Sequence, residues 1–154
     1  MRSVSTSVLL DAGPLGMVTN PRATPANDGA KRWLRSLVAG HAKVVILEID
    51  DYEVRRELVR LNSRRGLARL GSLTELAAYP PLNTSAMRLA AQFWARARNQ
   101  GIPTAGADAL DCDIILAAQA AQLAAESSDQ VVIATTNVRH LSLFVEARYR
   151  NEIG

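Results

Sequence analysis

Three short apolar runs along the chain are separated by longer segments in which apolar residues recur every three or four positions. The runs span 7–10, 43–47 and 131–134 and are almost continuous in valine, isoleucine and leucine. Such runs are typical of strands buried on both faces of a parallel sheet. The longer segments predict helices. We expect helices at 27–40, 50–61, 63–78, 84–100 and 108–125, and a short helix or loop with some strand character at 140–148.

The order of these elements predicts an α/β fold, a three-layer domain in which helices flank a mostly parallel central sheet. With 154 residues, 48% of them hydrophobic, the chain has the size and apolar content of one domain spanning 1–154. No apolar run approaches the roughly 20 residues of a membrane span, and the first run is too short for a secretory signal. We therefore expect a cytoplasmic protein without membrane contact. The single cysteine, Cys112, excludes an internal disulfide and a cysteine-based zinc site.

Polar side chains follow each predicted strand. Asp11 comes directly after the first strand, Asp50 and Glu53 follow the second, and Asn137 follows the third. A further acidic stretch, 108–113, opens the most apolar helix. Because right-handed crossovers place the carboxyl ends of parallel strands at one edge of a sheet, we expect these groups to converge there.

Converging carboxylates without lysine partners repel one another, so they need either shifted protons or a cation. Oxygen ligands from Asp, Glu and Asn suit Mg²⁺ or Mn²⁺. One or two such ions can activate water against a phosphodiester without a nucleophilic side chain. The sequence has no arrangement typical of a serine or cysteine nucleophile. Metal-dependent hydrolysis of nucleic acid is therefore the leading hypothesis.

Several of these residues also have structural interpretations. Asp50-x-x-Glu53 has the spacing of a capping box, in which the acidic residue at the third helical position bonds back to the cap. Aspartates in 108–113 can cap the following helix. Thr135 and Thr136 are typical of residues that settle a turn after a strand, although Thr136 can also orient a ligand or water.

Arginine provides 16 of the 18 basic residues, and the formal net charge is +3. The densest arginine run lies on the helices expected at 50–61 and 63–78. A solvated helix face accounts for such a run, and so does contact with the phosphates of RNA. Under the second interpretation Arg56 and Arg60 are the candidate RNA contacts.

Four segments, in order, resemble the motifs of PIN-domain nucleases, and most closely those of VapC-type toxins of bacterial toxin–antitoxin pairs. The resemblance spans about 7–144. It rests on Val8-Leu-Leu-Asp11-Ala-Gly-Pro-Leu, Tyr52-Glu53-Val-Arg-Arg-Glu-Leu58, Asp111-Cys-Asp113-Ile-Ile-Leu-Ala-Ala-Gln-Ala120 and Thr135-Thr-Asn137-Val-Arg-His140-Leu. The family resemblance implies a Mg²⁺- or Mn²⁺-dependent endoribonuclease that forms a homodimer and is inhibited by a cognate antitoxin protein.

Carried over to this sequence, the resemblance makes Asp11, Glu53 and Asp113 metal ligands and Asn137 a catalytic-site residue. Asp111 matches an accessory acidic position. It can join Asp113 only if it lies at or before the helix cap, because residues two apart in a helix face different ways. Asp113 therefore ranks above Asp111, and Asp108 ranks third as a loop or cap residue.

The last motif departs from the family pattern, because His140 stands where many members have another aspartate. We interpret His140 as a residue that supports the metal ligands without binding the ion, or as a structural residue. The same interpretation applies to Thr136. The departure leaves an alternative, a PIN-like domain that binds RNA or a protein without cleaving RNA.

A receiver-like signalling domain also gathers aspartates and a threonine at strand ends. That class requires a late lysine, and no lysine follows Lys43.

Overall fold

A four-stranded parallel sheet forms the centre of the computed structural model, which describes residues 4–101 and 107–154, with side chains from 111 onward in the second range. The strand order is β2-β1-β3-β4. The strands are β1 Thr6–Leu10, β2 Lys43–Val45, β3 Gln130–Ala134 and β4 Ala147–Arg148. All three pairs of neighbours are parallel. The predicted α/β fold with a mostly parallel sheet is therefore confirmed, and the segment expected as a short helix or loop adds a fourth strand.

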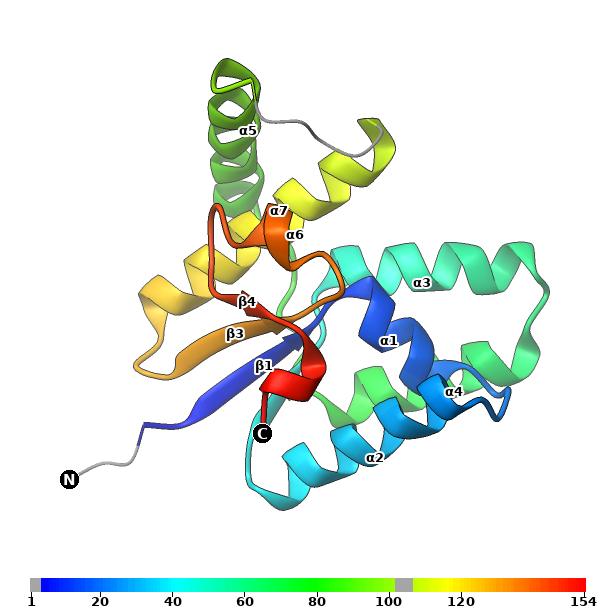
Figure 1. Ribbon diagram of the computed structural model, residues 1–154. Helices are drawn as coiled ribbons and strands as arrows, with labels where there is room; N and C mark the ends of the chain where they lie inside the picture. Colours follow the sequence, from blue (N-terminus) through cyan, green and yellow to red (C-terminus); the bar gives the residue numbers. More distant parts are fainter. Residues whose placement is uncertain (1–3, 102–106) are drawn as a thin grey trace.

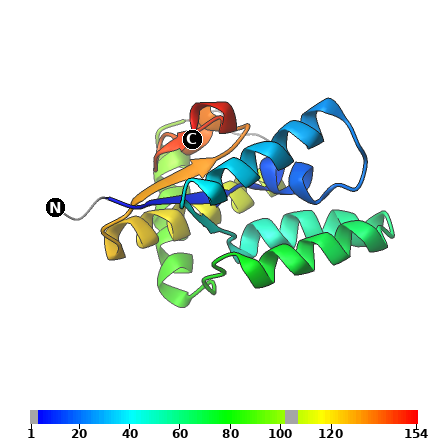
Figure 2. The ribbon, with the colours of Figure 1, turned by 90° about the horizontal axis from the view of Figure 1, so that it is seen from below.

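The helices alternate with the strands along the chain and cover both faces of the sheet. They are α1 Ala12–Thr19, α2 Pro25–Ala39, α3 Glu48–Arg60, α4 Arg64–Leu76, α5 Thr84–Asn99, α6 Ala107–Glu126, α7 Val138–Leu141 and a 3₁₀ turn, Arg150–Glu152. Figures 1 and 2 show α2 and α6 on opposite faces of the sheet, with α5 packed on α6. The antiparallel hairpin of α3 and α4 extends beyond the carboxyl ends of the strands (Figure 2).

Alternate residues of the strands divide the core between these two faces. On β1, Leu9 packs with residues of α5 and α6, whereas Val8 and Leu10 pack with residues of α1 and α2. All three side chains are fully buried. This double burial explains why the strand sequences are continuously apolar instead of alternating with polar residues.

Helix α1 was not predicted, because its Gly-Pro pair indicates a turn. Pro14 is the third residue of the helix, and a proline in the first turn is tolerated because its missing N–H has no helical partner there. Helix α2 begins at Pro25, and the hydroxyl of Thr24 accepts a hydrogen bond from Asn27 N at 3.1 Å. The helix expected at 27–40 therefore begins two residues earlier than predicted.

Two residues that the periodicity placed in the core lie at the surface. Trp94 of α5 is 42% exposed and Leu76, the last residue of α4, is 86% exposed. Trp94 lies at helical spacing from the buried Ala90 and Ala97, whereas Leu76 follows the only partly buried Leu73 by three positions. Among the described residues, every helix is too short or too polar to cross a bilayer.

Candidate metal centre

Three carboxylates from two segments meet at the carboxyl ends of the strands. Asp11, Asp50 and Glu53 each place one side-chain oxygen within 4.8 Å of the oxygens of the other two. Asp11 follows β1 directly, and the other two lie in the first turns of α3, which begins shortly after β2. The parallel pairing of β1 with β2 therefore brings together residues that lie far apart in the sequence.

Asp50 is the most deeply buried member of this group. It is 0% exposed, and neither of its carboxylate oxygens has a hydrogen-bond partner among the described residues. Burial raises the pKa of the Asp50 carboxyl well above its usual value, and the neighbouring charges of Asp11, Glu53 and Asp113 raise it further. An unpaired buried carboxylate is costly unless a cation or a proton compensates its charge.

The predicted capping box at Asp50 and Glu53 is wrong. Helix α3 begins at Glu48, its N-cap is Leu47, and no side chain bonds the cap. Asp50 is therefore the third helical residue, and Glu53 follows it by three positions on the same helix face. Both carboxylates point toward Asp11 instead of back to the helix end.

Asp11 is held by hydrogen bonds on both of its oxygens. Its Oδ1 accepts from Ala12 N at 2.8 Å, and its Oδ2 accepts from the hydroxyl of Thr135 at 2.6 Å. The Thr135 hydroxyl in turn accepts from Asn137 N at 2.8 Å. Asp11 is only 6% exposed, and Thr135 is buried. The end of β3 thus fixes the rotamer of the carboxylate that ends β1.

Asp113 reaches the same region from α6. Its Oδ2 accepts a hydrogen bond from the side-chain amide of Asn137 at 2.7 Å. Burial raises the pKa of Asp113 to about 6, with further contributions from the charges of Asp11 and Glu53, whereas the bond from Asn137 acts in the opposite direction. The charge of Asp11 therefore contributes to the raised pKa of the other three carboxylates at this edge of the sheet.

Glu53 lies between this group and the solvent. Burial and the charge of Asp11 raise its pKa, and a hydrogen bond from Cys112 and the charge of Arg56 lower it. Cys112 is buried, and its pKa rises to about 11 because of burial and the charge of Glu53. The thiol thus stays protonated and serves as a hydrogen-bond donor to Glu53.

The structure sets several other candidates apart from this group. Asp111 is exposed and lines a groove between α5 and α6 with Trp94 and Arg98. Asp111 could share a site with Asp113 only if it lay at or before the helix cap. It is instead the fifth residue of α6, well inside the helix, so this condition is not met. The side chain of Asp108 lies outside the described residues. Thr136 is exposed, and its hydroxyl oxygen would lie 3.1 Å from a Cβ added at Gly13. The hydroxyl that bonds Asp11 belongs to Thr135.

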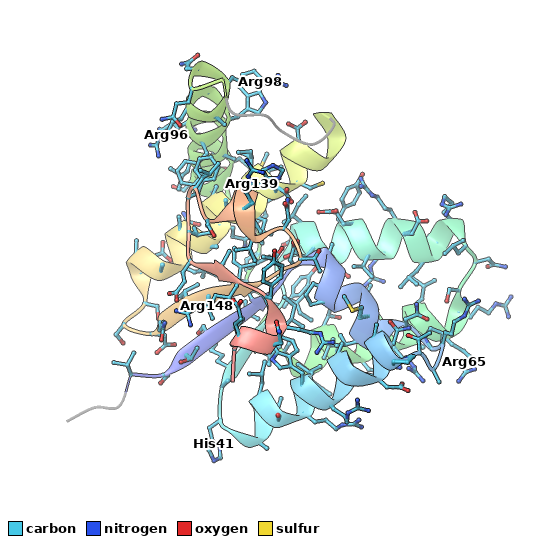
Figure 3. All side chains as sticks on the ribbon, in the orientation of Figure 1. His41, Arg65, Arg96, Arg98, Arg139 and Arg148 are labelled. Carbon is cyan, nitrogen blue, oxygen red and sulfur yellow. The ribbon has the colours of Figure 1, made fainter. Side chains whose placement is uncertain are left out.

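The basic candidates also differ from one another. Arg60 forms an ion pair with Glu57, whereas Arg56 lies beside the ring of Tyr52. His140, partly buried on α7, forms no ion pair or side-chain hydrogen bond with another described residue. Figure 3 places Arg65 at the outer tip of the α3–α4 hairpin, away from the strand ends, and Arg139 on α7.

The geometry and chemistry of the group fit a hard divalent cation. The donors are carboxylate oxygens, with an amide beside Asp113, which is the ligand type that Mg²⁺ and Mn²⁺ prefer. The unpaired oxygens of Asp50 give an independent reason for a cation, because described donors already bond Asp11 and Asp113 but leave Asp50 without a partner.

Comparison with solved structures identifies the fold. The structure superposes on a chain of VapBC2 from Rickettsia felis bound to a promoter DNA fragment, with a TM-score of 0.70 and 12% identity over 93% of this chain and 98% of that chain. FitAcB from Neisseria gonorrhoeae gives a TM-score of 0.70 and 21% identity over 95% of this chain and 99% of that chain. DNA-bound VapBC from Salmonella typhimurium gives a TM-score of 0.69 and 16% identity over 96% of this chain and 99% of that chain. The chain has the VapC-type PIN fold.

This finding confirms the predicted resemblance at the level of the fold. No family model and no curated protein matches the sequence. The identities of 12–21% explain that difference, because the spatial arrangement of the elements is kept while most of the side chains differ.

Sequence reasoning placed Asp50 at this edge of the sheet but interpreted it as a helix cap, and it did not assign Thr135 to the site. The signal for Asp50 was present, because its spacing of three from Glu53 puts both on one helix face. Thr135 and Thr136 are chemically identical neighbours after β3. Only the register of β3 on β1 decides which of them faces Asp11.

Proposed function

We propose that this protein is a metal-dependent endoribonuclease, the toxin of a toxin–antitoxin pair. The observation that carries the proposal is the buried, unpaired carboxylate of Asp50 beside Asp11 and Glu53, at the edge of the sheet where Asp113 also lies. A buried carboxylate without a partner lowers the stability of the fold unless a proton or a cation compensates its charge, and only a cation gives the cluster a chemical function. The VapC-type PIN fold supports the same function.

In this proposal Asp11, Asp50, Glu53 and Asp113 hold Mg²⁺ or Mn²⁺, in one or two positions. When bound, the ion supplies a more acidic water and stabilises negative charge on the phosphate. Thr135 fixes the orientation of Asp11, and Asn137 fixes that of Asp113. Because Asn137 bonds Oδ2 of Asp113, the other oxygen, Oδ1, remains to bind the ion.

We propose RNA as the substrate, in accordance with the resemblance to VapC-type toxins. The formal net charge of +3 and the sequence pI of about 9.5 favour a polyanion. Arg56 is the better candidate for a phosphate contact, because the ion pair with Glu57 already engages Arg60.

An antitoxin is the proposed protein partner, and a groove beside the metal centre suits one. The groove has a volume of about 390 Å³ and lies between α1, α2 and α3, with Gly16, Met17 and Leu58 among its lining residues and Glu53 at its border. A Cβ added at Gly16 would meet no atom within 4 Å, so no side chain of this protein fills the groove at that position. The three solved structures compared above are VapBC or FitAcB assemblies. The homodimer and the cytoplasmic location stay predictions.

Removal of the metal should abolish cleavage. We expect purified protein to cut single-stranded RNA in Mn²⁺ or Mg²⁺, and to leave it intact in EDTA because the carboxylates alone cannot activate water. Gel separation of labelled RNA measures the products, and restored activity on adding excess Mn²⁺ is the control against irreversible unfolding. Cleavage that persists in EDTA would contradict the metal mechanism. RNA binding without cleavage in any divalent metal would support the non-cleaving alternative, in which His140 marks an incomplete site.

A further inference from the structure

An exposed aromatic–arginine pair lies on α3 beside the candidate metal centre. Tyr52 is 55% exposed, and the guanidinium carbon of Arg56 lies 5.1 Å from the centre of its ring. Arg56 follows Tyr52 by four positions and Glu53 by three, so these side chains are neighbours on the helix surface. Because Glu53 belongs to the acidic group, Arg56 lies beside that group on the surface of α3.

We propose that Tyr52 provides a stacking surface for an unpaired RNA base adjacent to the scissile phosphate. The inference rests on the proposed function and adds a substrate class to it. Aromatic rings and arginine planes are the groups on which proteins stack unpaired bases. Arg56 covers one side of the Tyr52 ring, and its positive charge suits the phosphate that joins the stacked base to its neighbour.

Position distinguishes this pair from an ordinary surface contact. Trp94 and Arg98 form the same arrangement on α5, with a distance of 5.2 Å, and such pairs stabilise a helix on their own. Arg98 lies at the outer end of α5 (Figure 3). Arg56 instead lies one helical turn from Glu53, a member of the acidic group, so the Tyr52–Arg56 pair is on the part of α3 that carries the candidate metal centre.

The charges of the neighbouring arginines agree with this assignment. Arg55 donates to Asp51, and Arg60 pairs with Glu57. Among the described residues, Arg56 forms no ion pair with a carboxylate within 4 Å, so its charge is available to a phosphate. Bases within an RNA duplex are already stacked and cannot reach an exposed ring. The substrate class is therefore single-stranded RNA or the loop of a hairpin.

The test compares Tyr52→Phe, Tyr52→Leu and Tyr52→Ala, each combined with Asp113→Asn so that the RNA stays intact in Mg²⁺. The probes are single-stranded oligoribonucleotides with one 2-aminopurine at successive positions, whose fluorescence falls when that base stacks. We expect Tyr52→Phe to match its Asp113→Asn parent. Tyr52→Leu and Tyr52→Ala should bind RNA about 5- to 100-fold more weakly and lose the fluorescence quenching at one position. A duplex of the same sequence should respond to none of the three changes.

Leucine keeps apolar bulk but lacks an aromatic face, so equal binding by the phenylalanine and leucine variants would overturn the proposal. So would unchanged binding of the alanine variant. If Tyr52→Leu binds RNA normally but loses a co-purifying protein partner, the ring serves that partner and the proposal is wrong. Mn²⁺-dependent cleavage by the wild-type protein is measured separately. Its absence would remove the proposed function, whereas its presence with unaltered RNA binding by the Tyr52 variants would remove only this inference.

Discussion

Replacing Asp113 with asparagine should lower the rate of RNA cleavage by about three orders of magnitude, the scale of losing one preorganised electrostatic group at an active site. Asparagine keeps the size of the side chain but removes the negative charge that would help to hold the ion. The fold should survive, because the change also relieves repulsion by Asp11 and Glu53. Initial rates of cleavage of a labelled RNA in saturating Mn²⁺ measure the effect.

Asp111→Asn is the matched control, since it makes the same chemical change two residues away on the exposed face of α6. We expect it to cleave within about threefold of wild type, as its charge is screened by solvent. Asp11→Asn and Glu53→Gln should resemble Asp113→Asn, and none of the three inactive variants should arrest growth when expressed in bacteria. Equal losses in the Asp111 and Asp113 variants, or full activity in the latter, would refute the assignment of the site.

The metal-free protein should become less stable as the pH rises. The folded-state pKa of Asp113 is about 6 against an ordinary value of 3.8, and that of Asp50 is raised as well. The folded state therefore binds more protons than the unfolded state between these values, so the free energy of unfolding falls with rising pH. For Asp113 the loss is at most about 3 kcal/mol, and solvent screening reduces it because the side chain is partly exposed.

Thermal unfolding in EDTA at about pH 5 and about pH 7.5 measures this trend. The melting temperature should be higher at the lower pH, and Asp113→Asn should show a smaller difference. Excess Mn²⁺ should reverse the order, because metal binding requires the deprotonated ligands and stabilises the folded state by mass action. A wild-type protein whose melting temperature in EDTA is the same at both values, or rises with pH, would show that the carboxylates are not coupled as described.

The sequence predicts β1, β2 and β3 because each lies in an almost continuously apolar run, whereas β4, of two residues, has no such run. Continuous apolar runs such as Val44–Leu47 are too short for a helix of usual length and too apolar for a surface loop, so they indicate buried strands. The convergence of Asp11 and Glu53 also follows from topology alone, since parallel strands with helical crossovers must end at one edge. The four ordered motifs then point to the PIN fold even though overall identity with the similar structures is low.

The remaining details depend on where helices begin and which way single side chains face. Leu47 caps α3 without a side-chain bond, which a residue-by-residue interpretation cannot anticipate because Asp50 and Asp51 are far better caps by type. The α6 start at Ala107 puts Asp111 and Asp113 on different faces, whereas a later start would have left the question open. One-residue shifts of this kind decide which carboxylates share a site.

Anomalous diffraction from a crystal soaked in Mn²⁺ tests the metal centre most directly. We predict an anomalous peak among Asp11, Asp50 and Glu53, with carboxylate oxygens about 2.1 Å from the ion. No peak at this edge of the sheet in saturating Mn²⁺, or a peak held only by surface residues such as Asp111, would contradict the claim that these carboxylates form a metal centre.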